Sequence, residues 1–143
     1  MKNRRIVVIV GLLIIMVVFG FSYYGKQTSV PPVENKAPGN SAAAIEQAKN
    51  NGESMWLLFH STTCAPCVEM HKIFNQLQPA YQGKVRFIEI DVNDQVNIEL
   101  NQAWKIQYVP TTFIINSKGQ ISYQNVGIIP VEDLKKELNK VVK

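Results

Sequence analysis

The chain has 143 residues, enough for one domain of ordinary size and an additional segment. Its formal net charge is +4, but Lys2, Arg4 and Arg5 supply three of these charges. The rest of the chain has 12 basic and 11 acidic residues, which leaves +1. No basic stripe is present that would follow a phosphate backbone, so the sequence predicts no nucleic-acid partner.

The first 25 residues predict a cytoplasmic basic tip and a transmembrane anchor. Residues 6–24 are uncharged and almost wholly apolar, and as a helix they would extend roughly 28 Å, close to the hydrocarbon thickness of a bilayer. Basic residues precede this stretch and only Lys26 follows it closely, so the positive-inside rule places the N-terminus in the cytoplasm. A cleaved signal peptide is the alternative, although no Ala-x-Ala site follows. Either interpretation exports the remainder of the chain.

Residues 26–40 contain three prolines and few large apolar side chains, which predicts an extended linker. The folded domain is expected over residues 41–143. Ser41 is a suitable cap for a short helix that ends at Asn50. Residues 55–60 form a continuous apolar run, which is typical of a strand buried on both faces.

The remaining elements alternate between helix and strand before a final hairpin and helix. They are expected over about residues 64–77 (helix), 85–92 (strand), 94–104 (helix), 111–116 and 121–126 (paired strands), and 130–142 (helix). In the helix expected over residues 94–104, Asp94 is the expected cap, and Val96 and Ile98 are among the expected apolar positions. This order predicts an α/β domain with a central mixed sheet covered by helices on both faces.

The only two cysteines, Cys64 and Cys67, are separated by Ala65 and Pro66. They follow a buried strand and begin a helix, which places the Cys64 sulfur near unpaired N–H groups and the positive end of the helix dipole. Such positions lower a cysteine pKa from about 8.5 into the range of roughly 3.5–7.5. Cys64 is therefore the expected nucleophile and Cys67, one turn inside the helix, the expected resolving cysteine.

Other interpretations of the cysteine pair are less favoured. A structural disulfide that closes so short a loop would remove little chain entropy. A structural zinc site needs about four ligands, and beyond the two cysteines the chain offers only His60 and His71. Copper delivery usually depends on a longer spacing between the cysteines. The sequence therefore predicts a reacting pair and no bound metal.

The chain resembles the thioredoxin family. The matching pieces are LLFHSTTCAPC around the cysteines, YVPTTFIINSKGQI downstream and NVGIIP near the end. The resemblance implies a thioredoxin-like fold with a four-stranded sheet and thiol-disulfide exchange with protein substrates. No cofactor is expected, because the two sulfurs carry the electrons. The resemblance also implies a cis peptide bond at Pro110 and substrate contact by the Val109 backbone. It places Gly127 in the substrate groove and Thr63 at the rim beside Cys64.

The sequence departs from the family in several places. Thr63 and Ala65 replace a tryptophan and a glycine of the cytosolic thioredoxins beside the cysteines, and two buried positions also differ. Leu58 stands where the family carries an aspartate that accepts a proton from the second cysteine, and Phe87 stands where that aspartate has a lysine partner. Glu89 or a water is a candidate for the vacant role. His60 is a candidate for tuning Cys64, because a nearby imidazolium favours a thiolate.

These departures resemble the membrane-anchored, extracytoplasmic thioredoxin-like proteins of bacteria, which are commonly reductants supplied by a membrane electron donor. The sequence therefore predicts a tethered reductase of protein disulfides in the cell membrane, with its domain outside. An oxidase of the same fold that introduces disulfides is one alternative, and a non-catalytic thioredoxin-fold adaptor is another. Only a single helix is expected between Asp91 and Pro110, whereas strong oxidants of this fold usually carry a helical insertion, so a reductant is favoured.

Overall fold

The structure is a computed structural model that describes residues 41–142 of the chain. The predicted anchor and linker, residues 1–40, and residue 143 lie outside the described residues. Within residues 41–142, no helix is long and apolar enough to cross a membrane.

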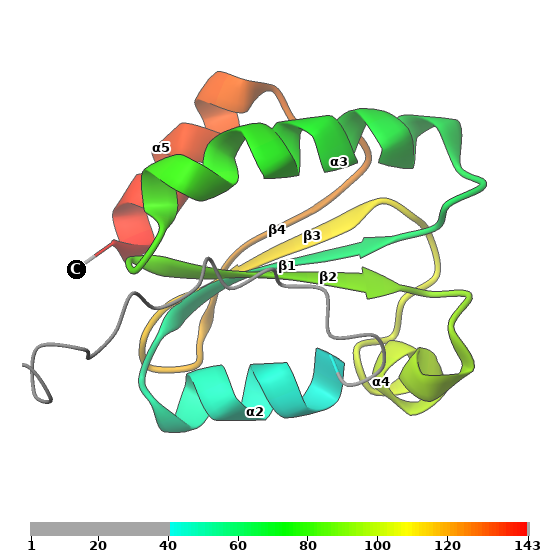
Figure 1. Cartoon of the computed structure of the whole chain (residues 1–143), viewed down its shortest axis with the longest axis horizontal. Helices are drawn as coiled ribbons and strands as arrows, with labels where there is room; N and C mark the ends of the chain where they lie inside the picture. The colour runs from blue at the N-terminus through cyan, green and yellow to red at the C-terminus, as the bar shows by residue number, and fades with distance from the viewer. Residues whose placement is uncertain (1–40, 143) are drawn as a thin grey trace, which may run out of the picture. The chain divides into compact units, whose positions relative to one another are not determined.

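A four-stranded mixed sheet forms the centre of the domain, in the order β2-β1-β3-β4 (Figure 1). Strand β1 (Ser54–His60) pairs in parallel with β2 (Val85–Asp91) and antiparallel with β3 (Thr111–Ile115). Strand β3 pairs antiparallel with β4 (Ile121–Val126) at the edge of the sheet. The predicted mixed four-stranded sheet is confirmed.

Helices cover both faces of this sheet (Figure 1). On one face lie α3 (Ala65–Leu77) and α5 (Val131–Val141), and on the other lie α2 (Ser41–Asn50) and α4 (Ile98–Ala103). Two 3₁₀ turns, Gln78–Tyr81 and Gln95–Asn97, follow α3 and precede α4.

Strand β1 contributes to the core on both faces, which explains its continuous apolar sequence. Trp56 and Leu58 belong to the core between the sheet and helices α3 and α5, which we call the α3-side core. Met55, Leu57 and Phe59 belong to the core beneath α2, which we call the α2-side core. All five side chains are 0% exposed, because successive residues of a strand point to opposite faces and both faces are covered here.

The segment predicted as one helix over residues 94–104 is divided in the structure. Asp94 caps the 3₁₀ turn rather than α4, and its carboxylate accepts the Val96 N–H at 3.1 Å. Val96 and Ile98, predicted on the apolar face, are instead 57% and 48% exposed. Asn97, only 4% exposed, turns inward and donates to the Asp91 carbonyl oxygen at 3.0 Å. This hydrogen bond determines which side of the segment faces the sheet, and it leaves the two apolar neighbours outside.

Candidate active site

Cys64 and Cys67 lie at the start of α3, directly after β1, and their sulfur atoms are joined as a disulfide. Cys64 has an extended backbone (φ −98°, ψ 115°) and is the N-cap of the helix, and its sulfur accepts the Cys67 N–H at 3.3 Å. Pro66 fits the first turn, where a missing N–H costs no helical hydrogen bond. Cys67 is 1% exposed, whereas Cys64 is half-buried. The cysteine at the helix terminus is therefore the accessible one, and free N–H groups at this end favour a negatively charged sulfur.

The loop before β3 lies opposite the disulfide. The Val109–Pro110 peptide bond is cis, and the Val109 carbonyl oxygen is 3.7 Å from the Cys64 sulfur. The Thr111 hydroxyl donates to the Tyr108 carbonyl oxygen at 2.6 Å, which closes the loop on itself. The backbone of Val109 thus forms one wall beside the Cys64 sulfur.

Gly127 joins the end of β4 to this loop. Its N–H donates to the Pro110 carbonyl oxygen at 2.8 Å, and its φ of +98° is a conformation that side chains disfavour. The structure therefore brings four predicted site residues into one place: Cys64 and Cys67 from α3, Pro110 from the loop before β3, and Gly127 from the end of β4.

Exposed apolar side chains adjoin the site residues in the sequence. Tyr108, next to Val109, is 68% exposed, and Val126 and Ile128, on either side of Gly127, are 52% and 45% exposed. Val68 is 49% exposed in the first turn of α3, because Cys67 and Met70 occupy the inward positions there. Exposed apolar groups around a site are typical of a surface that binds another protein.

A polar network that the sequence analysis missed holds the loop before Cys64. Asn93 donates through Nδ2 to the Ser61 hydroxyl at 2.7 Å, and the Ser61 and Thr63 hydroxyls are 3.0 Å apart. The Thr63 N–H also donates to Ser61 Oγ, at 3.3 Å. Ser61 follows β1 and Asn93 follows β2, two parallel neighbours whose carboxyl ends meet at one edge of the sheet. Polar residues after two successive strands were the signal that would have indicated this contact.

Thr63, Ala65 and Pro66 are exposed around the disulfide, so the predicted rim and motif residues are accessible to a partner. His60 ends β1, and its ring centroid is 6.2 Å from that of His71 on α3. Within residues 41–142, no group of three or more His, Cys, Asp or Glu side chains is placed to hold a metal ion.

At two positions the family carries a buried aspartate and its lysine partner, whereas this chain has apolar residues that belong to the α3-side core. Leu58 and Phe87 are 0% and 3% exposed. Phe87 packs its ring 4.9 Å from the centroids of both Trp56 and Phe74. An aromatic cluster occupies the space beneath α3 that a charged pair would otherwise take.

A family model described as a thioredoxin-like domain matches residues 41–142. The thiol-disulfide oxidoreductase ResA of Geobacillus thermodenitrificans is 24% identical over an alignment of 170 positions that covers 98% of each chain. Thioredoxin of Haemophilus influenzae is 28% identical over 95 residues, which covers 64% of this chain and 82% of that protein. Among solved structures, oxidised thioredoxin O2 of Arabidopsis thaliana superimposes with a TM-score of 0.62 at 20% identity, over 71% of this chain and 86% of that one.

Proposed function

This chain belongs to the thioredoxin-like family, and on that premise we propose that it is a membrane-tethered, extracytoplasmic thiol-disulfide oxidoreductase that reduces protein disulfides. The observation that carries the chemistry is the Cys64–Cys67 disulfide at the N-terminus of α3, with Cys64 half-buried and Cys67 buried beneath it. The relatives named as thiol-disulfide oxidoreductases and thioredoxins support the same activity.

In the reducing direction the reaction begins with the dithiol. The Cys64 thiolate attacks one sulfur of the substrate disulfide, and the other substrate sulfur leaves as a thiolate with the electrons of the broken bond. The resulting mixed disulfide lies beside the Val109 carbonyl, where an extended substrate segment would pair with the backbone. Cys67 then attacks the Cys64 sulfur, the mixed disulfide breaks, and the substrate departs reduced. Cys64 and Cys67 are left as the disulfide seen here.

The residues around the disulfide have the following roles in this scheme. The α3 N-terminus favours the Cys64 thiolate as attacking and leaving group. Val109 supplies backbone to the substrate, and Pro110 holds that backbone toward the sulfur. Gly127 supports the loop through its hydrogen bond to the Pro110 carbonyl oxygen. Thr63 is exposed at the rim and would contact substrate there.

The reducing direction is supported by the connection between β2 and β3. It holds only the turn Gln95–Asn97 and the six-residue helix α4, without the helical insertion expected of strong oxidants of this fold. An oxidase would use the same two sulfurs, with electrons flowing from a substrate dithiol to the protein disulfide. The reduction potential of the cysteine pair is therefore needed to distinguish a reductase from an oxidase.

The reduction potential of Cys64–Cys67 in a fragment of residues 27–143 tests the direction. A value near about −270 mV, like that of thioredoxin, supports a reductant, whereas a value near about −120 mV identifies an oxidant. A Cys67→Ser variant tests catalysis itself, because substrate proteins should accumulate as mixed disulfides on Cys64. A non-catalytic adaptor would keep its function when both cysteines are replaced by alanine, and that result would refute the enzymatic proposal.

The tether is supported by the uncharged apolar stretch over residues 6–24 and by the ResA alignment, which covers 98% of each chain and so includes most of the N-terminal segment. An extracytoplasmic domain needs a membrane electron donor, because the domain is separated from the cytoplasmic reductants. Deletion of residues 1–25 should release the protein from the membrane fraction. In cells whose cytoplasmic membrane is intact but whose outer envelope is permeable to protease, added protease should digest the domain of the full chain. Protection from protease would contradict the proposed topology.

A further inference from the structure

The resolving step of the proposed reaction requires a proton acceptor inside the domain. Cys67 is 1% exposed in the disulfide state, so bulk water has little direct access to its sulfur. Leu58 and Phe87, at the positions of the family's buried ion pair, have apolar side chains and cannot take that proton. A water that enters the site and the carboxylate of Glu89 are the acceptors left to consider.

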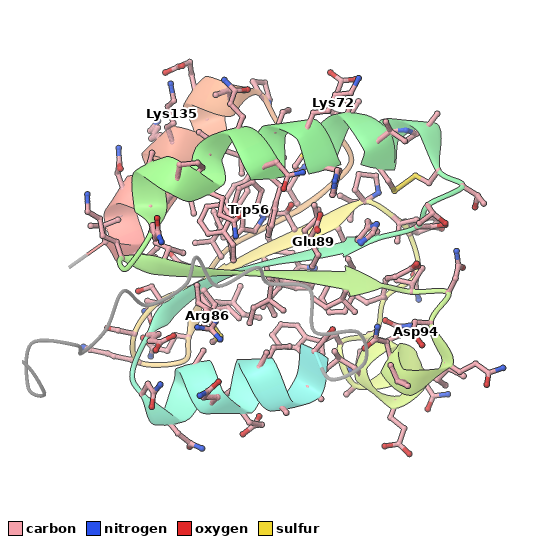
Figure 2. The ribbon with its side chains drawn as sticks, viewed as in Figure 1. Trp56, Lys72, Arg86, Glu89, Asp94 and Lys135 are labelled. Carbon is pink, nitrogen blue, oxygen red and sulfur yellow. A yellow bond between two sulfur atoms is a disulfide. The ribbon has the colours of Figure 1, made fainter. Side chains whose placement is uncertain are left out.

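Glu89 reaches this region from the neighbouring strand. In the parallel pairing of β1 and β2, Glu89 is the register partner of Leu58. Val85 and Phe87 of β2 belong to the α3-side core, so the alternation of the strand places Glu89 on the same face. Figure 2 shows its side chain on the side of the sheet that α3 covers. The side chain is 29% exposed, so the carboxylate lies between the core and the solvent.

The carboxylate is paired with an imidazole of the catalytic helix. His71 Nδ1 lies 2.5 Å from Glu89 Oε1, and Asn75 Nδ2 lies 2.8 Å from His71 Nε2. When the Asn75 amide donates to Nε2, the proton of the neutral ring is on Nδ1 and points at the carboxylate. His71 is also four residues after Cys67, which places it one turn along the same side of α3.

Two further titratable groups lie near the pair, one on β1 and one on β2. His60, at the end of β1, has its ring centroid 6.2 Å from that of His71. Asp91 is two positions beyond Glu89 on the same face of β2 and is the register partner of His60. Glu89 and His60 thus both adjoin His71, on the helix that carries Cys67 and on the two strands beneath it.

We propose that the Glu89–His71 pair accepts the proton that Cys67 loses when it attacks the mixed disulfide. This inference rests on the proposed function. The S–H bond of Cys67 breaks, and its proton passes to the pair and from there to solvent, since the His71 side chain is 48% exposed. The Cys67 sulfur bonds to the Cys64 sulfur, and the bond between Cys64 and the substrate breaks. The substrate sulfur leaves with that bonding electron pair.

The test separates the two chemical steps in one recording. The full chain is reduced in detergent and mixed with the aromatic disulfide dithiobis-nitrobenzoate, which releases one coloured thiolate at each step. The first release reports the attack of Cys64, and the second reports the attack of Cys67 on the mixed disulfide. A chain without the first release would contradict the proposed function. A change confined to the second release concerns the present inference alone.

Glu89→Gln keeps the shape of the side chain and removes its basicity. We expect the second release to slow by about tenfold or more near pH 7, since a positioned base typically contributes at least about a hundredfold and water or His60 would replace part of it. The rates of variant and wild type should converge toward pH 10, where hydroxide deprotonates the thiol without help. Acetate in the buffer should restore part of the lost rate. Replacement of His71 by glutamine is the second variant and should slow the same release.

Glu46→Gln is the matched control, because Glu46 is an exposed carboxylate on α2, paired with Lys49 at 2.9 Å on the opposite side of the sheet. Its two releases should match those of the wild type. If Glu89→Gln leaves the second release unchanged across the pH range, or slows it equally at every pH, the pair is only a surface ion pair and the inference is overturned.

Discussion

Replacement of Phe74 by alanine should loosen α3, the helix that carries the buried cysteine. Phe74 is 3% exposed, and its ring centroid lies 4.7 Å from that of Trp56 and 4.9 Å from that of Phe87. Truncation of a buried phenylalanine typically costs about 3–5 kcal/mol, because transfer free energy is lost and a cavity is left. The two lost aromatic contacts, each about 0.5–1.5 kcal/mol beyond area burial, place this site toward the upper part of that range.

The assay is guanidinium unfolding of the oxidised protein, followed by tryptophan fluorescence. In a thermal melt of a domain of this size, a loss of about 3 kcal/mol would lower the midpoint temperature by about 12 °C or more. Alkylation of Cys67 in the reduced variant should also be faster than in the wild type, because the helix above the sheet opens more often. Glu69→Ala is the control, since Glu69 is exposed on the same helix and should change the free energy of unfolding by no more than about 0.5 kcal/mol. A loss below about 1 kcal/mol in Phe74→Ala would refute the assignment of the aromatic cluster as the main support of α3.

Two further predictions concern buried hydroxyl groups at the other end of the domain. The Ser54 hydroxyl donates to the Val141 carbonyl oxygen at 2.6 Å, so Ser54→Ala should cost about 1–3 kcal/mol in denaturant unfolding, and an unchanged midpoint would contradict this. Burial raises the pKa of Tyr81 above its ordinary value of 10.0. The folded state therefore holds the phenol proton more tightly, and the associated stability is present below pH 10 and is lost as the pH rises through the raised pKa. Tyr81→Phe should lose less stability than the wild type when the pH is raised above 10, and equal losses in the two proteins would refute the assignment.

Local patterns in the sequence were sufficient for most of the fold. The apolar run of β1 is diagnostic because its side chains alternate between two covered faces, so every position is apolar. The start of α3 was predictable because an N-cap and a first-turn proline act within a few residues. The same locality fails for residues 94–104, where Asn97 turns inward to bond the Asp91 carbonyl. The spacing of Val96 and Ile98 predicts a buried apolar face, but it gives no information about the hydrogen bond that Asn97 makes.

The candidate site divides in the same way. Cys64 and Cys67 are close because they are three residues apart on one helix turn. The family resemblance also predicted that Pro110 lies beside them. The contact of Asn93 with Ser61 and that of Glu89 with His71 join residues that are 32 and 18 positions apart. Each depends on β2 lying parallel beside β1, which no local pattern encodes.

The sequence by itself therefore determined the chemistry of this protein, because a reacting cysteine pair is made by neighbours along the chain. It also determined the fold class, because helix and strand periods are local. Only the tertiary structure decided which side chains surround the pair, since strand order sets which distant residues meet. Leu58 is buried in the aromatic core, and the nearest carboxylate in the β1–β2 register is that of Glu89, which is paired with His71 on the helix that carries Cys67.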